Sequence, residues 1–128
     1  KKFLILIIAL LLVACGDSDP RQKDKDKVIE ILTKKGDFKT MGFTFREIEC
    51  LIDEVSTNMD DDMWEKYVEA VKLESAGFTE LEIIERLNFN KTQEVQYGAA
   101  VFNAIFSFKC MSEERLIELE SNRQINNQ

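Results

Sequence analysis

The chain of 128 residues contains no histidine, one proline, five glycines and one tryptophan. Histidine is the commonest general base and a frequent metal ligand near neutral pH, so its absence removes most hydrolytic and metal sites. The few glycines form no glycine-rich loop of the type that binds phosphate groups. We therefore expect a protein that is not an enzyme and that has no cofactor, metal ion or small-molecule substrate.

The absence of proline after position 20 and the absence of strand-like alternation both favour helices. Apolar residues recur at helical spacing instead, and a chain of this length buries a single core. The sequence predicts one all-α domain, a small helical bundle of about five or six helices around one central apolar helix at residues 91–111. The other helices are expected at about residues 27–35, 44–58, 60–75 and 79–88, with a short one after Ser112.

One short stretch occurs twice: GFTFREIECL at residues 42–51 and GFTELEIIERL at residues 77–87. In each copy a threonine, Thr44 or Thr79, is followed three residues later by a glutamate. This spacing predicts a capping box, in which each side chain binds the other residue's backbone N–H. Gly77 suits the left-handed residue that ends the preceding helix. Because the helices that follow differ in length, the shared stretch predicts helix boundaries and not a structural repeat.

The helix at residues 91–111 has two apolar faces. One face consists of Val95, Ala99, Phe102 and Phe106, and the other of Tyr97, Val101, Ile105 and Phe108. A helix that is apolar on nearly all sides is typical of the centre of a bundle, so we expect both faces to be buried. An earlier helix carries the stripe that should cover one of them, formed by Trp64, Tyr67, Val68 and Val71.

The N-terminal residues differ from the rest of the chain. Lys1 and Lys2 precede an apolar run at residues 3–14, which is shorter than the roughly 20 residues of a membrane-spanning helix. A positive start, a short apolar run and small residues before a break are typical of a secretory signal peptide. The sequence LVAC at residues 12–15 resembles the lipobox of bacterial lipoproteins, in which the peptide is cut before the cysteine.

The resemblance implies that Cys15 carries lipid, with acyl chains such as palmitate that enter the bilayer. A lipoprotein of this kind lies in the bacterial cell envelope. Gly16 follows the cysteine, where aspartate would favour retention in the inner membrane, so the outer membrane facing the periplasm is the expected location. The lipid bilayer is thus one expected partner.

The chain divides into four predicted parts. Residues 1–14 are the expected signal peptide. Residues 15–27 comprise the lipidated cysteine and a polar, charged stretch that we expect to be a disordered tether. The helical domain is expected at residues 28–122, and residues 123–128 are expected to fray.

Cys50 and Cys110 remain once Cys15 is lipidated. Two thiols in an exported chain favour a disulfide, which would contribute about 4 kcal/mol by the chain-entropy argument. However, Cys50 lies on the opposite side of its helix from the apolar residues Ile48 and Leu51. Two separate thiols, buried or facing a partner, are therefore the alternative.

The chain has 24 acidic and 17 basic residues, a net charge of −7. An acidic surface argues against nucleic acid as a ligand and is compatible with a basic protein partner, or with solubility alone. The run Asp60, Asp61 and Asp62 lacks the glycine and distal glutamate of an EF-hand loop. Negative charge at a helix N-terminus is therefore the favoured interpretation of this run.

Aromatic residues at predicted helix starts and loops, beside the acidic run, mark a candidate partner-binding site. The site comprises Phe43, Phe45, Phe89, Asp60, Asp61 and Asp62. The alternative is structural, with Phe43 as a hydrophobic staple and Phe89 as a lid on the core.

These features together predict a membrane-anchored, periplasm-facing lipoprotein that binds another envelope protein. In general plan it resembles the pilotins, small helical lipoproteins that escort secretin subunits to the outer membrane. The alternative is an immunity or inhibitor lipoprotein that neutralises a basic toxin or hydrolase acting on the envelope.

Overall fold

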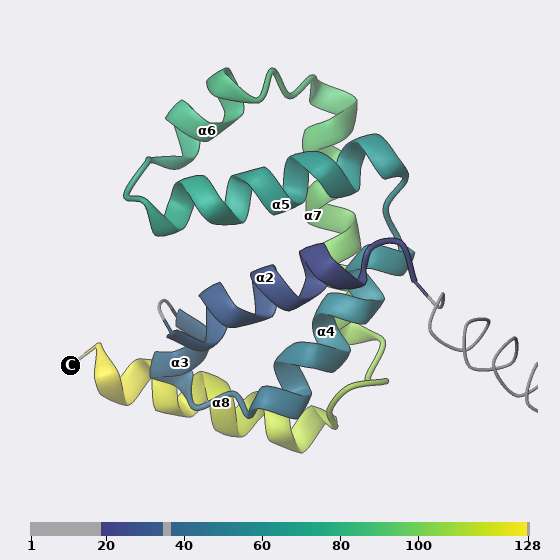
Figure 1. The fold of residues 1–128 in the computed structure, drawn as a ribbon. Coiled ribbons are helices and arrows are strands. Elements are labelled where there is room, and N and C mark those ends of the chain that lie inside the picture. The colour runs from purple at the N-terminus through teal and green to yellow at the C-terminus, as the bar shows by residue number, and fades with distance from the viewer. Residues whose placement is uncertain (1–18, 35–36, 128) are drawn as a thin grey trace, which may run out of the picture.

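The structure is a computed structural model that describes residues 19–34 and 37–127. The expected signal peptide and Cys15 lie outside the described residues. Within those residues the fold is all-helical, as predicted, with seven helices and no strand (Figure 1). The helices are α2 (Gln22–Lys34), α3 (Asp37–Met41), α4 (Phe45–Thr57), α5 (Asp61–Ser75), α6 (Glu80–Arg86), α7 (Lys91–Phe106) and α8 (Glu113–Asn126).

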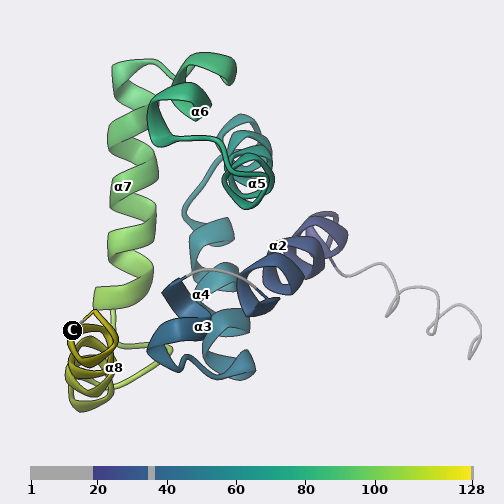
Figure 2. The same cartoon turned by 90° about the vertical axis from the view of Figure 1, so that its left-hand side faces the viewer.

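The bundle is organised around α4 and α5. Helix α4 packs against α2 on one side and against α7 on the other, and α5 packs against α2, α6 and α7 (Figure 2). Helix α3 packs on α8 at one end of the molecule, and α6 lies at the other end (Figure 1). The predicted central helix, α7, therefore lies at the edge of the bundle.

The core contains side chains from α2, α4, α5, α7 and α8. Ile48, Met63 and Leu119 are almost completely buried, and each such side chain stabilises the fold by about 1.5 to 3 kcal/mol relative to an exposed one. The predicted stripe on α5 is confirmed as a core face, since all four of its members are buried: Trp64, Tyr67, Val68 and Val71.

Three helix boundaries share one local structure. In each, a residue with positive φ is followed by a phenylalanine whose N–H donates to the carbonyl five residues earlier, the bond of a Schellman motif. The left-handed residues are Gly42, Gly77 and Asn88, with φ of 91°, 99° and 54°. The hydrogen bonds run from Phe43 to Phe38, from Phe78 to Leu73 and from Phe89 to Ile84, at 3.0, 3.1 and 3.1 Å.

The residue after each phenylalanine caps the next helix. Capping boxes are formed by Thr44 with Glu47, by Thr79 with Glu82 and by Asn90 with Gln93. The interpretation of the repeated stretch as helix boundaries is thus confirmed. The third copy was missed because asparagine replaces both the glycine and the threonine, although asparagine suits both positions.

The predicted tether is shorter than expected, because α2 begins at Gln22 and not near residue 27. Arg21 donates hydrogen bonds to the carbonyl oxygens of Ser56 and Met59 at the end of α4. Lys25 is buried, and its Nζ binds the carboxylates of Asp19 and Asp53. These long-range partners order a charged stretch whose composition alone is typical of disorder.

The C-terminal boundaries also differ from the prediction. Helix α7 ends at Phe106 and does not reach residue 111, because Phe108 has a left-handed φ of 57° and Ser112 already caps α8. Helix α8 continues to Asn126, so most of the tail at residues 123–128 is helical. The amide of Asn126 binds the carbonyl oxygen of Thr40 at 2.8 Å, which ties this end of α8 to α3.

Candidate interaction surfaces

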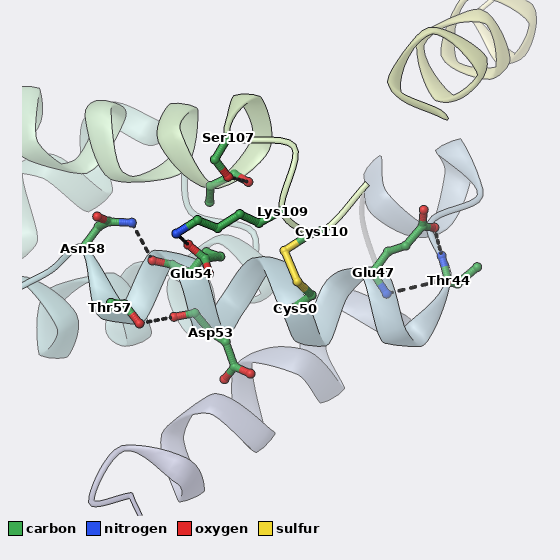
Figure 3. The surroundings of a disulfide bond; sticks show 11 residues. Thr44, Glu47, Cys50, Asp53, Glu54, Thr57, Asn58, Ser107, Lys109 and Cys110 are labelled. Carbon is green, nitrogen blue, oxygen red and sulfur yellow. Dashed lines mark hydrogen bonds and ion pairs between the residues drawn. A yellow bond between two sulfur atoms is a disulfide. The ribbon is translucent and has the colours of Figure 1, made fainter. Parts of the chain in front are cut away.

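Cys50 and Cys110 form a disulfide between α4 and the segment that joins α7 to α8 (Figure 3). Their Cα atoms are 5.5 Å apart, and 60 residues separate them in sequence. The predicted pairing is confirmed, and the alternative of two separate thiols does not hold. The direction of Cys50 is no obstacle, because α4 packs against α2 and also against α7, so two of its sides are covered.

The three phenylalanines of the predicted partner site do not lie together. Phe43 is half-buried and meets the ring of Phe38 edge-on, with the centroids 4.7 Å apart. Phe45 is exposed at the start of α4, whereas Phe89 is half-buried in the connection between α6 and α7. Figure 1 places these two segments at opposite ends of the molecule. The structural alternative therefore describes Phe43 and Phe89 better.

Each aspartate of the acidic run has its own structural contact. Asp60 caps α5 by accepting the N–H of Met63 at 2.8 Å. Asp61 pairs with Arg21 at 2.7 Å, and Asp62 accepts a hydrogen bond from the side chain of Gln93 at 2.8 Å. The run thus starts α5, as its helix N-terminus interpretation predicts. The structure therefore does not bring the six predicted residues together on one surface.

Exposed apolar side chains cluster on the outer face of α7, which we define as Val95, Ala99, Phe102 and Phe106. These residues recur at helical spacing on one side of the helix. Val95 is 71 % exposed, Phe102 58 % and Phe106 50 %. The rings of Phe102 and Phe106 lie against each other with centroids 4.5 Å apart. The prediction that both apolar faces of this helix are buried is therefore wrong for this face, and it is also wrong for Phe108 of the other face, which lies beyond the end of α7 and is exposed.

The face of α7 that enters the core is built on two alanines. Ala100 and Ala104 are 2 % and 1 % exposed, and both are members of the core cluster, against which the half-buried Tyr97, Val101 and Ile105 pack. Small side chains let a helix approach its neighbours closely. Ala100 and Ala104, one turn apart, are the sequence signal for the buried side of α7, which the large apolar residues conceal.

A cavity of about 320 Å³ lies between α5, α6 and the start of α7. Its lining combines apolar and aromatic side chains with three carboxylates, those of Glu74, Glu80 and Glu94. Tyr97 lines it as well, and burial, followed by the nearby charges of Glu74 and Glu80, raises the pKa of its hydroxyl to about 12. Tyr97 is therefore neutral at physiological pH.

The described ranges 19–34 and 37–127 contain neither a metal-binding cluster nor a membrane-spanning helix. No three His, Cys, Asp or Glu side chains there lie close enough together to hold a metal ion. No helix in these ranges combines the length and the hydrophobicity of a membrane span.

Comparison of the chain with protein-family models, with curated proteins and with solved structures finds no match. The candidate interaction surfaces thus come from the described structure alone, and they are the outer face of α7 and the cavity between α5, α6 and α7.

Proposed function

We propose that the chain is a non-enzymatic protein-binding module of the bacterial cell envelope, anchored through a lipid on Cys15. Its role would be pilotin-like or in envelope assembly. The observation that supports binding is the outer face of α7, which no helix of the described chain covers. Clustered aromatic and aliphatic side chains on a surface are typical of protein-binding sites.

The outer face of α7 is also distinct in charge. The chain has a net charge of −7, yet Val95, Ala99, Phe102 and Phe106 form an uncharged strip. Lys91, at the start of α7, precedes Val95 by four residues and so lies on the same side of the helix as this strip. An amphipathic partner helix that packs its apolar side on α7 would bury the strip. The charged residues of the partner helix would then not lie against the carboxylates elsewhere on the surface.

The position of the N-terminus favours a protein, and not the bilayer, as the partner of the outer face of α7. Only residues 16–18 separate Cys15 from Asp19, so an anchored cysteine lies within about 14 Å of the start of the described chain. Helix α2 begins there, and it lies on the opposite side of α4 from α7 (Figure 2). The outer face of α7 would consequently point away from the membrane and toward other proteins.

Site-specific photo-crosslinking in intact cells tests the binding function. A photoreactive amino acid at Ala99, inside the outer face, should capture a resident envelope protein that mass spectrometry identifies. The same amino acid at Lys23, exposed on α2, should not capture it. Phe102→Ser with Phe106→Ser should abolish capture from position 99 and leave the melting temperature unchanged, because both rings are exposed. Equal capture from positions 99 and 23 would refute the proposal, and an exogenous hydrolase at position 99 would support the inhibitor alternative.

The anchor has its own test. Cys15→Ser should prevent acylation and leave an uncleaved or soluble chain. The reason is that LVAC resembles a lipobox, in which the cysteine thiol accepts the acyl-bearing lipid. Fractionation and the intact mass of the protein measure both effects. A Cys15→Ser protein that stays in the membrane fraction at an unchanged mature mass contradicts the anchor.

A further inference from the structure

The cavity between α5, α6 and α7 differs from the outer face of α7 in shape and in charge. It is concave, and its volume of about 320 Å³ lies at the lower end of the range for ligand pockets in proteins, roughly 300 to 1,000 Å³. The end of α5, all of α6 and the first turns of α7 surround it. Its apolar lining is provided by Ala70, Phe78, Ile83, Ile84, Phe89 and Tyr97.

Three helices each contribute one carboxylate to this cavity. Glu74 comes from α5, Glu80 from α6 and Glu94 from α7. None of the three forms an ion pair with a lysine or arginine in the part of the chain that the structure describes. They are not a group of side chains that could hold a metal ion. Carboxylates without an ion-pair partner around an apolar hollow favour an organic cation with an apolar body.

The aromatic rings at the cavity already attract cations of this chain. The guanidinium carbon of Arg86 lies 4.1 Å from the ring centroid of Phe78, and Lys66 Nζ lies 5.5 Å from that of Phe89. Neither cation lines the cavity or pairs with its carboxylates. Tyr97 meets Phe89 edge-on at 6.1 Å and adds a third ring. Aromatic faces next to carboxylates are suited to guanidinium and ammonium groups.

We propose that this cavity receives an arginine or lysine side chain of the protein partner, an inference that rests on the binding function proposed above. The aliphatic stem would pack on Ile83, Ile84 and Phe89, as the stems of long basic side chains do on apolar surfaces. The cation would lie among Glu74, Glu80 and Glu94. An apolar side chain in the same place would strip water from the carboxylates without compensation, and an anionic one would be repelled.

Two peptides that differ only in charge test the proposal. The probes are acetyl-Leu-Arg-Leu-amide and its analogue with citrulline, the neutral isostere of arginine, titrated into the full chain in neutral detergent. Amide NMR shifts of Ile83, Phe89 and Tyr97 report binding, and partition into detergent affects both peptides alike. The arginine peptide should bind at least about tenfold more tightly than the citrulline peptide. A difference of this size corresponds to a few weak ion pairs.

Matched variants separate the cavity from the general charge of the protein. Glu74→Gln, Glu80→Gln and Glu94→Gln together should weaken the arginine peptide to the level of the citrulline peptide. The control variant carries Glu49→Gln, Glu65→Gln and Glu85→Gln, which remove the same charge from exposed residues that do not line the cavity. It should retain the preference for arginine. If the first triple variant melts early, the pair Glu74→Gln and Glu94→Gln, which keeps the first turn of α6 intact, replaces it.

The outcomes distinguish this inference from the binding function itself. Equal affinity for the two peptides, or equal weakening by both triple variants, overturns the cavity proposal and leaves the outer face of α7 untouched. Failure of specific capture from position 99 overturns the binding function, whatever the peptides do. Shifts confined to residues outside the cavity would also contradict the cavity as the site of the basic side chain.

Discussion

Arg115 of α8 binds Glu47 of α4 through two hydrogen bonds, from Nε to Oε2 at 2.9 Å and from Nη2 to Oε1 at 3.0 Å. The same carboxylate accepts the backbone N–H of Thr44 at 2.9 Å, so it also closes the capping box of α4. Arg115 further donates to the carbonyl oxygen of Gly42. One carboxylate therefore joins the start of α4 to a helix that is 68 residues distant in sequence.

The pair makes the stability of the fold dependent on pH. The hydrogen bond from Arg115 is the main cause that holds the pKa of Glu47 below its ordinary value of 4.5. A depressed pKa in the folded state stabilises the protein above the unfolded pKa, and the contribution is lost as the pH falls through the folded value. We expect Glu47→Gln to destabilise the protein at pH 7 and to do so progressively less below about pH 4.5.

Urea denaturation of the wild type and of Glu47→Gln between pH 3 and pH 7 measures this difference. Glu49→Gln is the matched control, because Glu49 is exposed on the same helix. Other carboxylates titrate in both proteins, so the difference between the two curves isolates Glu47. A difference that stays constant with pH would show that the ion pair contributes no charge-dependent stability.

The disulfide should be a major source of stability. Opening the bridge between Cys50 and Cys110 releases a loop of 60 residues in the unfolded chain, and the entropic contribution for that length is about 4 kcal/mol. Cys50→Ser with Cys110→Ser should therefore lower the free energy of unfolding by up to that amount. Thiol labelling of the unreduced, denatured protein should find neither cysteine free. Labelling of both would contradict the bridge, and equal denaturation midpoints would show that it adds no stability.

Because the N-terminal part of α2 is ordered, replacing its buried Lys25 should change the stability of the protein more than replacing its exposed Lys23. Burial alone would lower the pKa of Lys25, but its hydrogen bonds to Asp19 and Asp53 outweigh burial and raise it. Lys25→Ala should reduce the free energy of unfolding by about 1 to 2 kcal/mol, since both carboxylates lose their partner. Lys23→Ala, at an exposed position, should change it by less than about 0.5 kcal/mol. Equal effects would mean that α2 frays as far as residue 27.

Local features were predictable from the sequence, whereas long-range ones other than the disulfide were not. The capping boxes at Thr44 and Thr79 and the helix stop at Gly77 depend on residues within one turn, so the sequence shows them directly. The start of α2 depends instead on hydrogen bonds from Arg21 to acceptors that lie 35 to 40 residues later in the sequence. In the same way, the large apolar residues on both sides of α7 do not reveal which face the other helices cover; the small residues Ala100 and Ala104 mark the buried side.

Two glycines with equal room around them should respond to alanine in opposite ways. A Cβ atom added at Gly77 or at Gly98 would meet no atom of another part of the chain within 4 Å, so steric contact does not distinguish them. Gly77 has a φ of 99°, which alanine adopts only at a cost, and Gly77→Ala should destabilise the protein by about 1 kcal/mol. Gly98 lies within α7, where Gly98→Ala should stabilise it by about 0.5 to 1 kcal/mol. Urea denaturation of both variants measures the two changes, and a loss of stability in Gly98→Ala would mean that this position of α7 is not helical in solution.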